Sequence, residues 1–205
     1  SSQERTEQQF AQLADTLTKT INQSPYYAKL LADFADLKKI DAAMLAELPL
    51  TRKSDLHALQ QEQPPFGRLT QLAPPTLKRL FASPGPLYEP ETSRQDGWRF
   101  SRALYAAGIR SGDLLYNCFS YHFTPAGAMV ESGAFALGCA VFPAGTGQTE
   151  MQVRTIADLR PQAYVGTPSF LKIILDKGDD LGHDLGSLRK GLVSGEYFSP
   201  ELRSG

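Results

Sequence analysis

The feature that most constrains the fold is an alternation of short apolar runs with helix-like segments from residue 78 onward. We predict strands over residues 78–82, 114–119, 140–143, 163–166 and 191–194. Between them, helical spacing of apolar residues predicts helices over residues 93–107, 126–137, 151–159 and 169–176. Strands that alternate with helices in this way are typical of an α/β layered sheet with parallel strands and flanking helices.

The first part of the chain has a different pattern and is predicted to be an α-helical N-terminal segment. Apolar residues recur at helical spacing over residues 3–34, and two shorter helices are expected over residues 41–46 and 51–59, the last capped by Thr51. Two proline pairs, at 64–65 and 74–75, bracket a loop-rich stretch. We therefore expect two domains, residues 1–75 and residues 76–205.

Composition excludes several classes of partner. The net charge of −1 and the absence of a basic run argue against nucleic-acid binding. The apolar stretch at residues 126–143 contains Glu131 and several glycines, and it is too short to span a bilayer. The two cysteines, Cys118 and Cys139, lie in apolar runs without ligand spacing, so we expect reduced core residues of a cytoplasmic protein and no metal site.

Ligands of parallel α/β sheets gather at the carboxyl ends of the strands, and several suggestive segments lie there. These segments are residues 83–90, 121–127, 145–150, 165–169 and 193–197. Each has a simpler reading: aromatic residues that only pack on the core, Thr149 as a plain helix N-cap, or a tight glycine turn. No segment by itself decides between a ligand site and a connection.

Taken in order, however, five stretches resemble the phenylacetate–CoA ligase branch of the adenylate-forming superfamily. The stretches are Leu48-Pro49-Leu50-Thr51-Arg52-Lys53-Ser54-Asp55-Leu56, Ala107-Gly108 with Gly112-Asp113, Gly147-Gln148-Thr149-Glu150 with Gln152-Val153, Arg160-Pro161 with Thr167-Pro168-Ser169-Phe170, and Ser194-Gly195-Glu196-Tyr197. The resemblance covers roughly residues 20 to 205 and implies that the chain is the N-terminal part of such a ligase's large domain.

The segment from Ser83 to Pro90 resembles the family's phosphate loop, S-[ST]-G-T-T-G-x-P, in its position and flanks. It follows the strand at residues 78–82, and we expect a helix to begin near Thr92 or Ser93. Such loops bind anions through backbone N–H groups, hydroxyls and often a lysine. Here Pro86 and Leu87 replace the threonines, Tyr88 replaces the second glycine and Glu89 replaces the lysine.

The resemblance implies an activity and a set of site residues. Family members activate a carboxylic acid with ATP and Mg²⁺ to an acyl-adenylate, and then transfer the acyl group to coenzyme A. Carried over by position, Ser83 and Gly85 would contact the phosphates of ATP. Gly195 and Glu196 would lie beside the adenine. The acid pocket would be lined by Tyr121, Phe123, Gly145, Thr146 and Gly147, and the catalytic residues stay unknown.

Two hypotheses remain open at the level of sequence. In the first, the full-length protein is a working acyl- or aryl-CoA ligase, and another residue, such as Arg94 or Arg99, supplies the missing positive charge. In the second, it is a degenerate homologue that binds a nucleotide, an acyl-CoA or a protein without catalysis. The chain stops just inside the helix that Ser199-Pro200 opens, so we expect a longer parent protein or pairing with a second copy.

Overall fold

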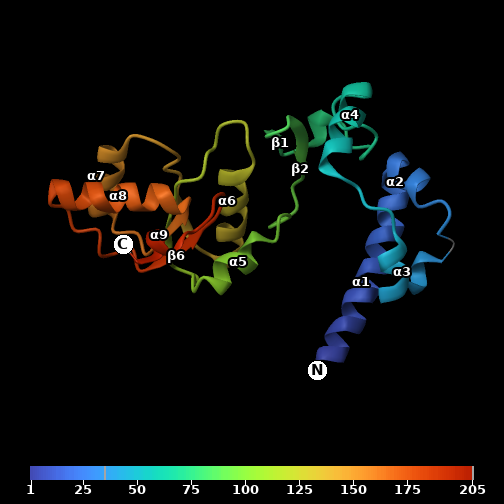
Figure 1. The fold of residues 1–205 in the computed structure, drawn as a ribbon, viewed down its shortest axis with the longest axis horizontal. Helices are drawn as coiled ribbons and strands as arrows, with labels where there is room; N and C mark the ends of the chain where they lie inside the picture. The colour runs from blue at the N-terminus through green and yellow to red at the C-terminus, as the bar shows by residue number, and fades with distance from the viewer. Residues whose placement is uncertain (35, 205) are drawn as a thin grey trace. The chain divides into compact units, whose positions relative to one another are not determined.

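The computed structural model describes residues 1–34 and 36–204, which form two compact units, Ser1–Pro90 and Glu91–Gly205. Figure 1 traces the order of their elements along the chain. The boundary between the units falls after Pro90, near the end of a separate two-stranded sheet formed by residues 79–83 and 87–91. The predicted domains, a helical segment over residues 1–75 and an α/β subdomain over residues 76–205, stay a prediction.

The first unit is helical apart from one hairpin. Its elements are α1 (Ser2–Gln23), α2 (Pro25–Leu30), η1 (Leu37–Lys39), α3 (Ala42–Glu47), α4 (Lys53–Glu62), η2 (Pro74–Thr76), β1 (Arg79–Ser83) and β2 (Leu87–Glu91), of which the last residue lies past the boundary between the units. A small core of α1, η1 and neighbouring residues buries Ala14, Leu31, Leu37 and Ile40. The helical N-terminal segment is thus confirmed, but the N-cap of α4 is Arg52, with no side-chain bond, and not Thr51.

The second unit is a four-stranded parallel sheet covered by helices on both faces, which confirms the expected α/β class. The strand order is β4 (Ala140–Phe142), β3 (Leu114–Asn117), β5 (Ala163–Gly166) and β6 (Lys190–Val193). Its helices are α5 (Phe100–Ala106), α6 (Ala126–Leu137), α7 (Thr149–Leu159), α8 (Pro168–Leu181) and α9 (Pro200–Ser204).

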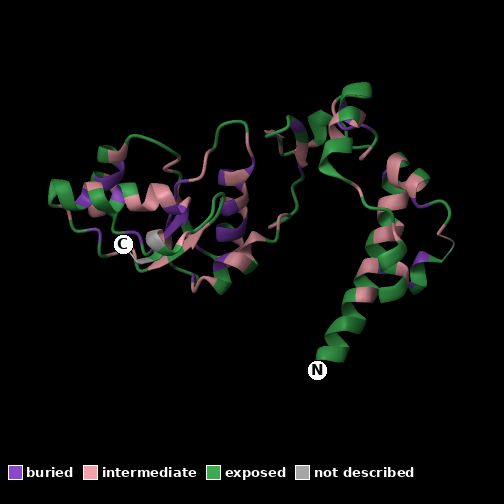
Figure 2. Cartoon of the chain, viewed as in Figure 1, coloured by how far each residue is buried: buried purple, intermediate pink, exposed green. Residues whose placement is uncertain are grey.

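Alternating side chains along the strands build one core on each face of the sheet. Leu115 and Val165 pack with residues of α5 and α6, whereas Tyr116 and Tyr164 pack with residues of α7 and α8. This period of two is what a strand that is buried on both faces requires. Figure 2 shows the same contrast in helices: α6 carries buried residues along its length, while α1 is mostly exposed.

The helix expected from Thr92 or Ser93 is wrong, because α5 begins at Phe100. Residues up to Glu91 belong to β2, and Asp96 then adopts a left-handed conformation with φ of 45°. The Asp96 carboxylate accepts a hydrogen bond from the Phe100 amide at 2.8 Å and from the Ser101 hydroxyl. Asp96 therefore caps the first turn of α5 and sets where this helix starts.

Candidate functional site

The carboxyl ends of all four parallel strands lie along the same edge of the sheet, and the loops that follow these ends form the candidate site. These loops are residues 118–125 after β3, 143–148 after β4, 167 after β5 and 194–199 after β6. The sheet therefore brings four of the predicted segments to a common edge, as expected for parallel strands. Three polar side chains, Asn117, Gln152 and Glu196, hold these loops.

Asn117, fully buried at the end of β3, organises the first loop. Its Nδ2 donates to the Tyr121 hydroxyl at 2.7 Å and to the Gly127 carbonyl at 3.0 Å, and its Oδ1 accepts from the Phe119 amide at 3.2 Å. One buried amide thus connects the strand, the loop and the first turn of α6. Sequence reasoning missed Asn117, although a polar residue inside an apolar strand is a usable signal.

The two aromatic residues predicted for the acid pocket differ in their surroundings. Tyr121 packs its ring against Gly127, where an added Cβ would come within 2.9 Å, and its hydroxyl donates to Glu131 at 3.1 Å. Phe123 has a left-handed φ of 63°, is 70% exposed and stacks edge-on against His122. Tyr121 is therefore held at the N-terminus of α6, while Phe123 projects to solvent; their role in an acid pocket stays a prediction.

The loop after β4 contains the predicted residues Gly145, Thr146 and Gly147 in an unusual backbone conformation. Gly145, Gly147 and Gln148 all have left-handed φ angles, of 67°, 79° and 50°. The Gly145 amide donates to the Asn117 carbonyl at 3.0 Å, and Gln152 Nε2 donates to the carbonyl of Gly147 at 3.1 Å. Because the chain turns left-handed through Gln148, Gln148 is the N-cap of α7 and the expected cap at Thr149 is wrong.

A cavity of about 180 Å³ lies beside this loop, between β4 and α7. The stacked rings of Tyr116 and Phe142 form one wall, with ring centroids 5.2 Å apart, and Thr146 and Gln152 add polar groups. The cavity lies on the sheet face that α7 covers, whereas Tyr121 packs against α6. The structure thus brings Thr146, but not Tyr121, to the lining of this cavity.

The loops after β5 and β6 meet around Gly195. Its φ of 90° is left-handed, and a Cβ there would lie 3.5 Å from Thr167 and 3.7 Å from the Phe119 ring. The Glu196 carboxylate accepts a hydrogen bond of 2.6 Å from the Ser169 amide, and hydrogen bonds from Ser169 lower the pKa of Glu196 below its usual range. Glu196 therefore caps α8, a role that its distance in sequence from Ser169 concealed.

The predicted phosphate-binding residues, Ser83 and Gly85, lie in the β1–β2 hairpin of the first unit. Ser83 is 7% exposed, and its hydroxyl has no hydrogen-bond partner within residues 1–34 and 36–204. Gly85 is at the turn, with φ of 152°, and a Cβ added to it would lie 3.9 Å from Lys53 Cε. Gly195 and Glu196 belong to the second unit, so the joint nucleotide site stays a prediction.

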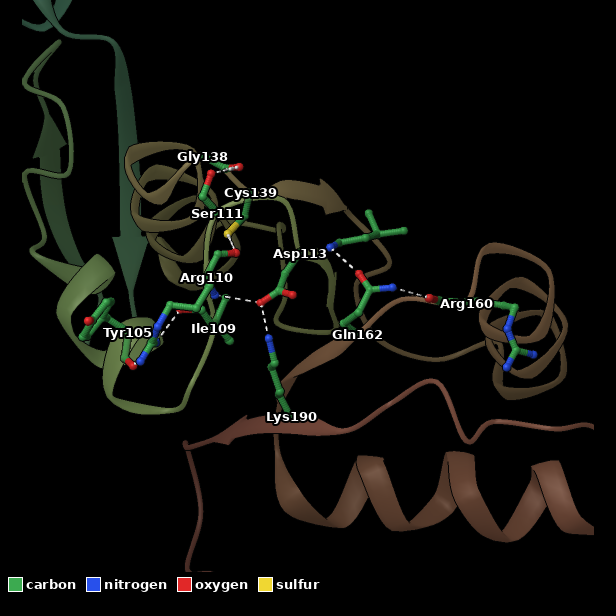
Figure 3. Close-up of polar contacts among 11 residues, drawn as sticks. Tyr105, Ile109, Arg110, Ser111, Asp113, Gly138, Cys139, Arg160, Gln162 and Lys190 are labelled. Carbon is green, nitrogen blue, oxygen red and sulfur yellow. Dashed lines mark hydrogen bonds and ion pairs between the residues drawn. The ribbon is translucent and has the colours of Figure 1, made fainter.

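The opposite edge of the sheet carries a polar network, drawn in Figure 3, that is separate from the candidate site. The Asp113 carboxylate accepts hydrogen bonds from Lys190 Nζ at 2.6 Å and from the Arg110 amide at 2.7 Å. Gln162 accepts from the Leu114 amide at 2.8 Å and donates to the Arg160 carbonyl. These contacts join the starts of β3, β5 and β6, so Asp113, which matches the family's Gly-Asp motif, has a structural role.

The described residues contain neither a metal-binding cluster nor a membrane-spanning helix. Within them, no group of three or more His, Cys, Asp or Glu side chains has the spacing to hold a metal ion. None of the described helices combines the length and the apolar character that crossing a membrane demands. Cys118 and Cys139 are buried and unpaired with each other, as expected for core residues.

Comparison with known proteins supplies the family. No family model matches the chain. It is 33% identical over 180 residues to the phenylacetate-coenzyme A ligase of Aromatoleum evansii, which covers 82% of this chain and 39% of that enzyme. It is 34% identical over 169 residues to the enzyme of the same name from Pseudomonas putida, covering 78% and 37%. The chain therefore spans less than two fifths of the length of these two relatives.

Solved structures show the same fold. The open conformation of 2-hydroxyisobutyryl-CoA ligase, in complex with 2-HIB-AMP and CoA, superposes with a TM-score of 0.87 over 99% of this chain and 47% of that one, at 19% identity. The sequence identities to the curated ligases and the shared α/β architecture agree with the five ordered motifs. The chain is a partial-length member of the phenylacetate–CoA ligase-like branch of the adenylate-forming superfamily.

Proposed function

We propose that the full-length protein is a cytoplasmic acid–CoA ligase that activates a carboxylic acid with ATP and transfers the acyl group to coenzyme A. The observation that carries this proposal is that three ligase-like segments, residues 147–150, 167–170 and 194–197, follow the carboxyl ends of parallel strands at one edge of the sheet. A Cβ added at Gly195 would lie in van der Waals contact with Thr167 and Phe119, and the Glu196 carboxylate accepts a hydrogen bond from the Ser169 amide. Loops at this edge are where α/β sheets bind their ligands.

The hairpin of the first unit has features that fit the phosphates of ATP. The Ser83 hydroxyl has no hydrogen-bond partner among the described residues, and Lys53 Cε would lie 3.9 Å from a Cβ added at Gly85. Hydroxyls and lysines are common donors to phosphate. We therefore propose Lys53, at the start of α4, as a source of the charge that the loop lost with its lysine; Arg94 and Arg99 stay untested.

The second unit would contribute the adenine and acid sites. We propose that the backbone at Gly195 receives the adenine, while Glu196 fixes this turn through the Ser169 amide. Tyr121, Phe123 and the loop from Gly145 to Gly147 would border the acid. In this arrangement the chain binds and orients the reactants, and the chemistry is favoured by proximity and electrostatic stabilisation.

Mg²⁺ and coenzyme A are implied by the family, and neither is assigned to residues of this chain. Within residues 1–34 and 36–204 no cluster of acidic or His side chains fits a cation. The ion would offset phosphate charge, and coenzyme A would supply the thiol that accepts the acyl group. Pairing of two copies likewise stays a proposal.

One observation favours the second hypothesis, a homologue that binds without catalysing. Pro84 and Pro86 flank Gly85 in the hairpin turn and have no N–H to offer a phosphate. Glu89, on β2, places a negative charge in the segment expected to bind an anion. A carboxylate near phosphate repels it by an energy that, at an effective dielectric of about 20, reaches several kcal/mol.

Acid-dependent exchange between ATP and pyrophosphate decides between the two hypotheses. It would be measured with the full-length protein over a panel of aryl and short aliphatic acids. We expect exchange with at least one acid, which would demonstrate adenylation and name the substrate class. If no acid supports exchange and calorimetry detects no ATP binding, the ligase proposal fails and the non-catalytic homologue remains.

A further inference from the structure

Gln152, on α7, is buried to 95% and lies under the loop that follows β4. Its Nε2 donates to the carbonyl oxygens of Ala144 at 3.4 Å, of Gly145 at 3.3 Å and of Gly147 at 3.1 Å. One side-chain amide therefore gathers three carbonyls of a loop that is only a few residues long. We propose that Gln152 is a positioning residue, which fixes this loop for recognition of the acid.

The loop needs such a support because its backbone is unusual. Three of the four residues from Gly145 to Gln148 have left-handed φ angles, and Gln148 is not a glycine. Left-handed backbone costs energy for a residue with a side chain, so it persists only where neighbouring contacts hold it. The Gly145 amide, bonded to the Asn117 carbonyl, holds one end, and Gln152 holds the carbonyls along the loop.

The buried amide of Gln152 shows that this side chain does more than fill the core. Its Oε1 is buried and has no hydrogen-bond partner among the residues that the structure describes. An unpaired buried acceptor lowers stability, and an apolar side chain of similar length would avoid that cost. A glutamine is therefore unfavourable for packing at this position, but its Nε2 supplies the hydrogen-bond donor for the three loop carbonyls.

The inference rests on the proposed function, since it assigns the loop from Gly145 to Gly147 to the acid. Nothing in the contacts of Gln152 involves the hairpin with Ser83 and Gly85, or the turn at Gly195. Its substitution should consequently weaken recognition of the acid and leave recognition of ATP unchanged.

The first test is Gln152→Met in the full-length protein, with the exposed Arg154→Met on the same helix as the matched control. In acid-dependent ATP–pyrophosphate exchange, we expect the KM for the acid to rise about tenfold or more, as for other small misplacements of a binding group. The KM for ATP should be unchanged, and the thermal midpoint should change little, because the lost donor to the loop carbonyls and the removal of the unpaired Oε1 act in opposite directions. Amide hydrogen exchange at residues 145–148 should accelerate, and the control should match the wild type throughout.

The second test is Gln152→Glu across pH. Burial raises the pKa of a carboxyl, and only the neutral acid has an O–H that can donate to a carbonyl. The ratio of the variant's acid KM to that of the wild type should therefore fall as the pH is lowered. A structural defect alone would leave this ratio independent of pH.

The outcomes separate the inference from the proposed function. If the wild type shows no exchange with any acid, the proposed function fails, and the amide exchange of residues 145–148 still tests the positioning role. If the wild type is active but Gln152→Met keeps its acid KM and its amide exchange, the inference is wrong. Equal losses of stability and of recognition for both acid and ATP would also overturn it, because they indicate a purely structural role.

Discussion

At the scale of single residues, Asp113 carries a pH-dependent part of the stability of the second unit. Its burial alone raises the pKa of the carboxyl, but the hydrogen bonds from Lys190 and the Arg110 amide, and the charges of these residues, outweigh burial and lower it. Because the folded-state pKa is lowered, this stabilisation is present above the unfolded-state pKa and is lost as pH falls through the folded-state value.

We expect Asp113→Asn to reduce the free energy of unfolding by about 2 kcal/mol at neutral pH, since hydrogen bonds to a charged partner are of this size. Urea denaturation of the variant and the wild type between neutral and acidic pH would measure the difference. The difference in unfolding free energy between the variant and the wild type should decrease as the pH falls. A difference that stays constant down to acidic pH would contradict the assigned role of the carboxylate. Asp158→Asn, at an exposed position of α7 in the same unit, is a suitable comparison.

Lys53 gives the second prediction at this scale. If it supplies charge to the Gly85 turn, Lys53→Met should weaken ATP binding by the full-length protein about tenfold, which corresponds to about 1.4 kcal/mol. Glu89→Lys should strengthen binding, because it replaces repulsion with attraction. Isothermal titration calorimetry would measure both, with the exposed Lys19→Met as control; equal affinities for Lys53→Met and the control would refute the assignment.

At the scale of elements, regular segments were predictable and their caps were not. The strand at residues 163–166 and the helix at residues 126–137 were predicted with the bounds that the structure shows, because apolar runs and periodicity mark them. The predicted start of α5 was wrong because Asp96 caps the helix from outside it, and α8 runs to Leu181, past the predicted end at residue 176. The apolar spacing that predicts a helix does not mark a capping residue that lies outside it, as Asp96 does.

The β1–β2 hairpin is an element that depends on one side chain of α4. Gln60 is 8% exposed; its Nε2 donates to the Tyr88 carbonyl at 2.9 Å and its Oε1 accepts from the Tyr88 amide at 2.8 Å. Gln60 thus pairs the edge of β2 as a neighbouring strand would, and an isolated two-stranded sheet is otherwise marginal.

We therefore expect Gln60→Leu to lower the free energy of unfolding of the first unit by about 2 kcal/mol, because it leaves two backbone groups of Tyr88 unpaired. Gln60→Glu, which can still accept from the Tyr88 amide, should lose less. Hydrogen exchange at the Tyr88 amide should be fastest in Gln60→Leu, slower in Gln60→Glu and slowest in the wild type. Unchanged exchange in Gln60→Leu would show that the hairpin does not need this support.

The cap of α8 gives a further prediction at the level of elements. Glu196→Ala should accelerate hydrogen exchange at the Ser169 amide, since that amide loses its acceptor. The lowered pKa of Glu196 means that the wild-type protection persists above the unfolded-state pKa and disappears as pH falls through the folded-state pKa. Exchange of the neighbouring amides in the middle of α8 serves as the internal control, and a pH-independent protection would contradict the cap.

At the scale of the whole molecule, the family and the fold class were predictable from ordered motifs and from strand–helix alternation. The polar residues that join loops across the sheet were not, because Asn117, Gln152 and Glu196 act on backbone groups whose positions only the fold defines. Ser83 and Gly85, in the first unit, were named from a motif, and their part in nucleotide binding stays a prediction.

The cysteines offer a test of how the second unit opens as a whole. Burial raises the pKa of Cys118 to about 12 and also raises that of Cys139, and the two thiols lie in the cores on opposite faces of the sheet. Both should therefore be inert to a thiol reagent in the native state, since only an exposed thiolate reacts.

Under mild denaturant, with Cys118→Ala and Cys139→Ala variants identifying each thiol, equal labelling rates would mean that both faces open in one cooperative step. Faster labelling of one cysteine would show that its face opens separately, and rapid labelling without denaturant would contradict the packing of both cores.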